Sequence, residues 1–219
     1  MPFHLLRAAL CLTFSILTLR ADIPWTEVAQ RLAQENEKLA RRAQGHDREY
    51  FVVCTVYYTP IEAAFTAKRS FNVTPETRPG LEGRQFARDF LDAVKMEGFG
   101  RLITPVKGKN YIRYNGKGTF AFTAHPRGRA GKLIPRFSAA VPRGSFTPGR
   151  KLVLDNESVG ALLGHNFVKI ADTGGALRRW QVDLYWGEDE PMGPGKLLAR
   201  PRGTEFEYAY SKAMLKGPD

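Results

Sequence analysis

The residues from 167 to 187, FVKIADTGGALRRWQVDLYWG, constrain the fold more than any other part of the chain. They contain two apolar runs of strand character, residues 167–171 and 181–186, separated by a Gly-Gly turn and a basic segment. Asp172 closes the first run and Asp183 lies inside the second. The segment therefore predicts two strands that each carry a carboxylate.

The position of Asp183 within its run points to chemistry. Alternation along a strand gives two faces. Val182, Leu184 and Trp186 lie on the apolar face, and Gln181, Asp183 and Tyr185 lie on the opposite face. A carboxylate among aromatic and branched residues is costly to bury unless it is paired or its pKa rises. We expect a raised pKa at Asp183, caused by burial near Trp186 and Tyr58, and a raised pKa suits a general acid/base.

Composition and charge predict a globular protein with an anionic partner. The chain has 219 residues, of which 43% are hydrophobic and 25% charged, enough for one domain with a core. Its formal net charge of +11 suits an anionic polymer of the cell envelope. Nucleic acid is the other partner that such a charge suggests, but the basic residues are scattered through Gly- and Pro-rich segments, without an RNA-binding signature. We therefore expect no nucleic-acid partner.

The first 21 residues have the pattern of a secretory signal peptide. His4 and Arg7 precede an apolar run at residues 8–19, which is too short to span a membrane comfortably, and a polar Asp22 follows. Leu19 stands where a small residue is usual before the cleavage site, so that an uncleaved anchor is the alternative. We expect export to the periplasm, the cell envelope or the exterior, with no membrane contact once the signal is removed.

The cysteines and histidines argue against a disulfide and a metal site. Cys54 is the one cysteine outside the leader, so no disulfide can form within the exported chain, and its apolar surroundings predict a buried structural thiol. The histidines form no cluster with Cys, Asp or Glu at ligand spacing. We expect no metal and no other cofactor.

Hydrophobic periodicity predicts two amphipathic helices and a series of short strands. The helices cover residues 25–48 and 83–96, the second stopped by Gly98. Further strands are expected at residues 49–59, 111–114, 119–124, 137–141 and 205–210. Short strands at this spacing indicate a β-barrel or a sandwich.

Two features near the expected strand at residues 49–59 leave alternatives open. Tyr57-Tyr58-Thr59-Pro60 is either a strand end with half-buried tyrosines or part of the lining of a sugar-binding groove. Glu97, at the end of the second helix, is either a solvated last-turn residue or a second carboxylate that reaches this groove.

The residues ADTGGALRRWQVDLYWG also resemble the signature of the three-aspartate (3D) domain, which reads roughly A-D-T-G-G-A-I-K-G-x-x-I-D-L-F. This domain is found in bacterial cell-wall proteins and in the membrane-bound lytic transglycosylase A (MltA) family. Tyr57-Tyr58-Thr59-Pro60 resembles its first barrel strand and VKMEGFG its insert, so that the resemblance spans residues 49–198. It implies a mainly β fold, a six-stranded double-psi β-barrel with an N-terminal helix and a helical insert. The implied parts are a signal at 1–21, a helix at 22–48, the barrel at 49–200 with its insert near 83–97, and a C-terminal strand and tail at 201–219.

The chain departs from the family pattern at one aspartate. The stretch GKLIPRFSAAVPRG resembles the strand A-V-D-P-x-x-I-P-x-G, and Pro142 or Arg143 stands where the first of the three aspartates should fall. This departure puts the role of the missing carboxylate in doubt, but not that of Asp172 or Asp183.

The resemblance implies an exported lytic transglycosylase that cleaves the β-1,4 bond between N-acetylmuramic acid and N-acetylglucosamine in peptidoglycan. Asp183 would be the single general acid/base, and Asp172 would hold the loop or orient the catalytic group. The implied substrate-binding residues are Tyr58, Thr59, Thr173, Gly174, Gly175, Tyr185 and Glu97. Peptidoglycan glycan strands are the expected partner, and a monomer is expected.

Two other classes of function remain open from the sequence. A barrel that binds cell-wall polysaccharide without cutting it, as expansins do, is favoured by the missing aspartate and by the lack of a large second domain to cover the glycan. The other is a structural envelope protein or secreted effector that uses the barrel as a scaffold.

Overall fold

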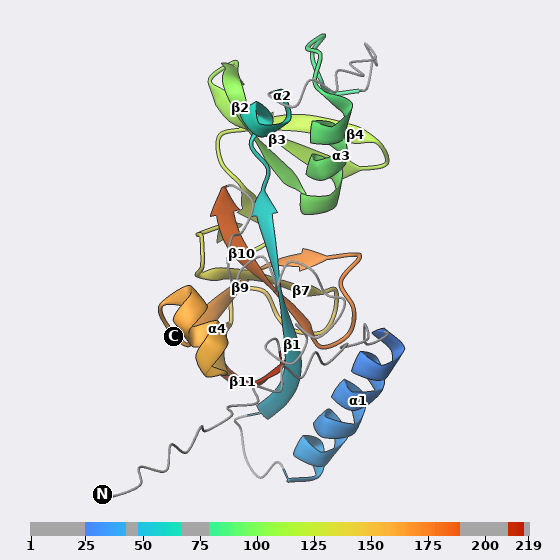
Figure 1. The fold of residues 1–219 in the computed structure, drawn as a ribbon, viewed down its shortest axis with the longest axis vertical. Coiled ribbons are helices and arrows are strands. Elements are labelled where there is room, and N and C mark those ends of the chain that lie inside the picture. The colour runs from blue at the N-terminus through green and yellow to red at the C-terminus, as the bar shows by residue number, and fades with distance from the viewer. Residues whose placement is uncertain (1–24, 43–47, 67–78, 189–209, 217–219) are drawn as a thin grey trace, which may run out of the picture.

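The computed structural model describes residues 25–42, 48–66, 79–188 and 210–216. These residues form a β-barrel, an insert beyond the far end of its first strand, and a helix beside the barrel (Figure 1). The expected signal peptide and most of the strand expected at 205–210 lie outside the described residues.

Six strands hydrogen-bond into a closed barrel in the order β1-β10-β7-β9-β8-β11. Their bounds are β1 Arg48–Thr59, β7 Ser138–Pro142, β8 Lys151–Asp155, β9 Phe167–Gly174, β10 Gln181–Glu188 and β11 Tyr210–Lys216. The pairs β1 with β10 and β7 with β9 are parallel, and the other four are antiparallel. The expectation of a mainly β fold is therefore confirmed, and six strands form one closed ring.

All six barrel strands contribute to one hydrophobic core, together with the helix α1, Trp25–Arg42. The two strands of the signature segment bury Val168, Ile170, Val182 and Leu184 in it. From α1, Val28 and Leu32 pack on the same core. The Asn36 amide fixes α1 to β1, because it donates to the Phe51 carbonyl at 2.6 Å and accepts from the Phe51 N–H at 2.9 Å. Cys54 is fully buried in this core, as expected.

The insert is a small layer of helix on sheet with its own core. It comprises α2 Glu62–Thr66, α3 Arg88–Glu97 and a sheet of β2 Phe99–Val106, β3 Lys109–Gly116 and β4 Thr119–Thr123. Phe90 and Val94 of α3 pack on Ile112 and Phe122 of the sheet. The strands expected at 111–114 and 119–124 thus exist, but they belong to a separate sheet and not to the barrel. The expected second helix begins at Arg88, five residues later than its periodicity suggested.

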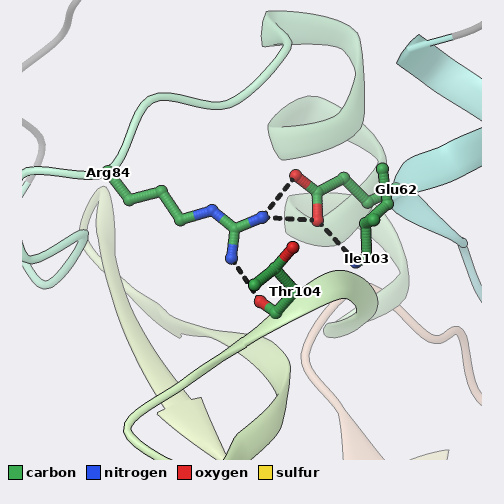
Figure 2. Close-up of polar contacts among 4 residues, drawn as sticks. All are labelled: Glu62, Arg84, Ile103 and Thr104. Atoms are coloured by element: carbon green, nitrogen blue, oxygen red, sulfur yellow. Dashed lines mark hydrogen bonds and ion pairs between the residues drawn. The ribbon is translucent and has the colours of Figure 1, made fainter.

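A partly buried ion pair joins the parts of the insert (Figure 2). The Arg84 guanidinium donates to both carboxylate oxygens of Glu62, at 2.9 and 3.0 Å, and also donates to the Thr104 carbonyl. Glu62 accepts a further hydrogen bond from the Ile103 N–H at 2.8 Å. The Glu62 carboxylate thereby has donors enough to offset the loss of its hydration.

Three short elements complete the described fold. The strands β5 Arg127–Gly128 and β6 Gly131–Lys132 form a hairpin. The helix α4, Glu157–Leu163, follows β8; the Asn156 side chain caps it by accepting from the Val159 N–H at 2.9 Å. Of the helices described here, none is long and apolar enough to cross a membrane.

Candidate active site

Strand pairing places the two aspartates of the signature segment on either side of one alanine. Asp183 of β10 pairs with Ala140 of β7, and Ala140 pairs with Asp172 of β9. On its other side, Asp183 pairs with Thr55 of β1. Residues directly opposite one another project from the same face of a sheet. Asp172, Asp183 and Thr55 therefore lie on one face of the barrel wall.

This face is the one turned away from the barrel core, toward the insert. Val182 and Leu184 enter the core, as their alternation predicts. On the opposite face, Tyr185 joins a separate apolar cluster with Tyr57 of β1 and Phe99 of β2. Since β2 belongs to the insert, the two aspartates lie where the insert meets the barrel.

A chain of hydrogen bonds fixes the Asp183 carboxylate. The Thr55 hydroxyl Oγ1 donates to Asp183 Oδ1 at 2.5 Å, and Gln181 Nε2 donates to the same hydroxyl at 2.9 Å. The orientation of the Gln181 amide is set in turn, because its Oε1 accepts from the Arg178 N–H at 3.0 Å. Since the Thr55 oxygen accepts from Gln181, its single proton goes to Asp183. Oδ1 is thus occupied, and the other oxygen of Asp183 is left for a proton.

The pKa of Asp183 is raised from 3.8 to about 6. Burial is the main cause, because the charged form is poorly solvated there, while the bond from Thr55 acts in the opposite sense. The raised pKa of Asp183 was expected from the sequence. Trp186, however, is not the neighbour of the Asp183 carboxylate that the sequence suggested. Trp186 packs against the barrel core, on the other face of β10, with the Arg136 guanidinium 4.7 Å from the centre of its ring.

Glu97 belongs to the same group of carboxylates. It ends α3, and its Oε2 accepts from the Tyr58 backbone N–H at 3.2 Å. Burial raises the pKa of Glu97 to about 7, with a smaller contribution from the charge of Asp183. The alternative of a solvated last-turn glutamate is therefore wrong, because the insert folds back on the end of β1 and holds this side chain near Asp183.

Asp172 lies in a more cationic setting. Its Oδ1 accepts from the Thr173 N–H at 2.8 Å, and its carboxylate also accepts from the Arg129 N–H. Burial raises the pKa of Asp172, while these bonds and the charges of Arg129 and Arg143 act to lower it. Two backbone donors hold the Asp172 carboxylate in a fixed orientation on the face of the barrel wall that also carries Asp183.

Tyrosines complete this face of the wall. The Thr59 hydroxyl and the Tyr185 hydroxyl are 2.7 Å apart and share a hydrogen bond. The Tyr57 ring lies 5.2 Å from the Tyr185 ring, and within the described part of the chain its buried hydroxyl has no hydrogen-bond partner. Burial and the charges of Asp172 and Asp183 raise the pKa of Tyr57 well above 10. This hydroxyl therefore stays protonated and can donate a hydrogen bond.

The structure brings most of the candidate residues from the sequence to this region. Tyr58 contributes its N–H to Glu97, and the side chains of Thr59 and Tyr185 bind each other. The Thr173 hydroxyl is buried without a hydrogen-bond partner among the described residues. Gly174 pairs with Pro142, and the Arg143 guanidinium is 3.8 Å from the place where a Cβ of Gly175 would stand.

Sequence reasoning missed Thr55. It named Tyr57 only as part of the Tyr57-Tyr58-Thr59-Pro60 segment, and it gave Gln181 a face but no role. Alternation along β1 was the available signal, because it groups Thr55, Tyr57 and Thr59 on one face. A cavity of about 620 Å³ lies elsewhere, between α1, the start of β1 and Trp180, and contains none of these residues. Within the described ranges no cluster of three His, Cys, Asp or Glu side chains could hold a metal ion.

Comparison with known proteins gives a likeness at the level of structure. No protein-family model and no curated protein sequence matches the chain. Among solved structures it is similar to Escherichia coli MltA with bound chitohexaose, at 16% identity over 92% of both chains and a TM-score of 0.48. It is also similar to a membrane-bound lytic murein transglycosylase of Agrobacterium tumefaciens, at 14% identity over 84% of both chains and a TM-score of 0.49. A third is the lytic transglycosylase LtgG of Burkholderia pseudomallei, at 15% identity over 86% of this chain and 81% of that one, with a TM-score of 0.41. The structures to which the chain is similar thus include those of the family that its sequence motifs resemble.

Proposed function

We propose that the protein is a lytic transglycosylase that cleaves the β-1,4 bond between N-acetylmuramic acid and N-acetylglucosamine in peptidoglycan, with Asp183 as its single general acid/base. The observation that supports this most is the state of Asp183, a partly buried carboxyl with a pKa of about 6 and one oxygen fixed by Thr55. An acid with a pKa near the working pH can both give and take a proton efficiently.

The reaction needs one carboxyl group in two successive roles. In the first step, protonated Asp183 gives its proton to the glycosidic oxygen, and the bond from this oxygen to the anomeric carbon of the muramyl residue breaks. In the second step, the muramyl 6-hydroxyl attacks that carbon, and its proton passes to the Asp183 carboxylate. The products are a 1,6-anhydromuramyl end and a free N-acetylglucosamine end, and Asp183 is protonated again. No water is consumed, so no second carboxylate at a set distance is required.

Neighbouring groups support the two states of Asp183. The Thr55 hydroxyl donates to Oδ1 whether Asp183 is protonated or ionised. The transferred proton would therefore be carried by Oδ2, which favours proton transfer on that side of the carboxyl group. The charge of Asp183 helps to keep the Tyr57 hydroxyl protonated, and this hydroxyl has no hydrogen-bond partner among the described residues, so it would be available to donate to the substrate. Asp172 would orient the loop that follows it through its bond from the Thr173 N–H.

We propose substrate contacts for the residues around Asp172 and Asp183. Thr59, Tyr185 and the backbone of Gly174 and Gly175 would offer hydrogen bonds and apolar contact to the sugar rings, with Tyr58 and Thr173 beside them. Glu97, with its pKa of about 7, would be largely neutral when Asp183 acts and would bind substrate as a hydrogen-bond donor.

The wider setting of the activity is proposed with it. The barrel strands would follow the double-psi connection of the 3D domain, the chain would be exported to the periplasm or the cell envelope, and it would act as a monomer. These proposals rest on the sequence motifs and on the leader-like residues 1–21.

The direct test is digestion of purified peptidoglycan sacculi, with mass spectrometry of the released muropeptides. Wild type should release products with 1,6-anhydro-N-acetylmuramic acid, and Asp183→Asn should release none above background. Asp155→Asn, at an exposed carboxylate of β8, is the matched control and should behave as wild type.

Two results would contradict the proposal in different ways. Products with reducing ends would indicate a hydrolase, with Glu97 or Asp172 as its second carboxylate. No release by wild type, with both proteins sedimenting with sacculi, would leave a polysaccharide-binding barrel.

A further inference from the structure

A cavity of about 620 Å³ lies between α1, the start of β1 and the segment before β10. From α1 it is lined by Ala33, Glu37 and Ala40, and this spacing places the three residues on one side of the helix. The two alanines leave room that longer side chains would fill. Pockets that bind small molecules have volumes of about 300–1,000 Å³, so this cavity is large enough for a ligand.

Two aromatic rings contribute to the lining from the barrel. The ring centres of Tyr50 and Trp180 are 5.7 Å apart, and both residues are partly exposed. Phe146, which is buried in the barrel core, supports them, because its ring centre lies 5.0 Å from that of Tyr50 and 6.4 Å from that of Trp180. The two rings therefore form a fixed aromatic surface, on which the apolar face of a sugar ring can pack.

The backbone of Trp180 is held in an unfavourable conformation. Its φ of 67° lies in the left-handed region, which a bulky residue rarely adopts. The Trp180 carbonyl accepts from the Val53 N–H at 3.0 Å, and the Gln181 N–H donates to the Arg178 carbonyl at 3.0 Å, so hydrogen bonds fix the segment on both sides. Backbone strain of this kind is concentrated at binding and active sites. The conformation of Trp180 is thus a second observation, besides the cavity, that points to a ligand.

Charged side chains of both signs complete the lining. They are the guanidinium groups of Arg48 and Arg179 and the carboxylates of Glu37 and Glu49. Glu37 forms an ion pair within α1, whereas Arg48, Arg179 and Glu49 form none across the described segments. The formal charges of the lining balance, so it does not select a charged ligand. It offers both donors and acceptors, which suits hydroxyl and acetamido groups, because these groups donate and accept as well.

We propose that this cavity is a second saccharide-binding site, which holds an uncharged segment of a glycan. The ligand class follows from the lining, because a wholly apolar ligand would leave the charged groups without partners and a polyanion would be repelled by Glu37 and Glu49. None of the residues around Asp183 lines the cavity, so the inference goes beyond the proposed activity and concerns binding alone.

The test is a titration with chitohexaose, a neutral hexamer of N-acetylglucosamine, followed by NMR at the tryptophan indole N–H groups. Asp183→Asn is the background, so that the probe is not cut, and Trp180→Phe assigns the Trp180 signal. We expect a saturable shift of this signal, from which Kd is obtained. Added salt should leave Kd unchanged, because the probe carries no charge.

Filling the cavity from the helix should remove this binding. Ala33→Trp and Ala40→Trp each place a large side chain in the cavity from an exposed position of α1, and each should raise Kd at least about tenfold. Gln34→Trp is the matched control, because Gln34 is exposed on the same helix but does not line the cavity, and its Kd should be unchanged. Arg179→Ala should raise Kd about threefold, as expected for the loss of one exposed hydrogen bond.

Three results would overturn the proposal. They are a Trp180 signal that chitohexaose does not move, the same Kd in Ala33→Trp as in Gln34→Trp, and tighter binding of polyglutamate or of a free stem peptide than of chitohexaose. The outcome is distinguishable from that of the proposed function. If wild type cuts no peptidoglycan but chitohexaose binds at Trp180 and Ala33→Trp prevents it, the activity is wrong and the second site stands. If peptidoglycan is cut but the Trp180 signal does not respond, the activity stands and the second site is wrong.

Discussion

Glu62 is a buried carboxylate and Asp183 a partly buried one, and their surroundings are opposite. Glu62, in the insert, is 5% exposed and accepts hydrogen bonds from Arg84 at both oxygens and from the Ile103 N–H. Asp183, in the barrel wall, has one bond from Thr55 and no cation within ion-pair distance among the residues that the structure describes. The pKa of Asp183 rises to about 6 as a result.

The difference separates a carboxylate that holds a fold together from one that is prepared for chemistry. Glu62 is charged and paired, so it joins α2 to β2 and to the segment before α3 (Figure 2). Asp183 is held in place but left short of donors, so its charged state is costly and proton transfer is easy. Removing the charge should therefore have opposite effects on stability at the two positions.

Asp183→Asn should give the largest change and should uncouple activity from stability. We expect a loss of activity of about a thousandfold, because Asn cannot transfer a proton. Between pH 3.8, the ordinary pKa, and about 6, the folded state binds more protons than the unfolded state, so wild-type stability falls as pH rises through this window. The variant has no such penalty and should be more stable than wild type by up to about 3 kcal/mol at neutral pH.

Urea unfolding at several pH values measures this effect. The difference in free energy of unfolding between Asp183→Asn and wild type should be largest above the pKa of about 6 and should vanish below 3.8. A variant that is less stable than wild type at neutral pH would show that the Asp183 charge is well solvated after all.

Glu62→Gln should change stability in the other direction. It leaves the Arg84 guanidinium without its charged partner, and because Arg84 is about a quarter exposed we expect a destabilisation of about 2 kcal/mol, less than for a fully buried pair. Urea unfolding gives the free energy, and hydrogen exchange at the Ile103 amide reports the loss within the insert.

A second substitution checks the origin of that loss. Arg84→Met added to Glu62→Gln should recover part of the stability, because it removes the unpaired charge and keeps the apolar stem. If the double variant is as unstable as the sum of the two single ones, the pair is not the cause.

The same comparison explains how far sequence reasoning reached. The strands of the signature segment, and the faces of Val182 and Asp183, follow from alternation, which is a local property. The sheet of the insert was misassigned because β2, β3 and β4 have the same short-strand signal as a barrel, and only the packing of α3 on them separates the two cores.

The contacts that define the site depend on pairing between distant segments. Thr55 and Asp183 are 128 residues apart in sequence, and they meet only because β1 and β10 are parallel neighbours in a particular register. Glu97 lies near enough to feel the charge of Asp183 only because the insert returns to the end of β1, where Glu97 accepts from the Tyr58 N–H. Residue types and spacing do not specify such a register, so sequence reasoning found the acid but not the groups that orient it.

Thr55→Val should have an intermediate effect and should change the pH dependence. It keeps the shape of the side chain but removes the bond that orients Asp183, and we expect kcat/KM to fall about tenfold. Wild-type kcat/KM should decline above the Asp183 pKa of about 6, because the first step needs the protonated acid. The Thr55 bond lowers this pKa, so the decline in Thr55→Val should begin at higher pH.

Gln181→Met sharpens this test, since it frees the Thr55 hydroxyl to rotate without removing it. It should shift the profile in the same direction as Thr55→Val but by less. A profile that moves to lower pH in Thr55→Val would contradict the proposed direction of the hydrogen bond.

Glu97→Gln should have the smallest effect, and it tests whether one carboxyl group suffices. Below the Glu97 pKa of about 7 both forms of the side chain are neutral, so kcat/KM should change less than about threefold. Above that pH the negative charge of Glu97 in wild type favours the protonated form of Asp183. The variant lacks this charge, so its kcat/KM should decline at a slightly lower pH than that of wild type. The products should keep their 1,6-anhydro ends, as mass spectrometry can show. If wild type instead makes reducing ends and Glu97→Gln makes none, Glu97 activates water, and the barrel wall and the insert each supply one acid of a hydrolase.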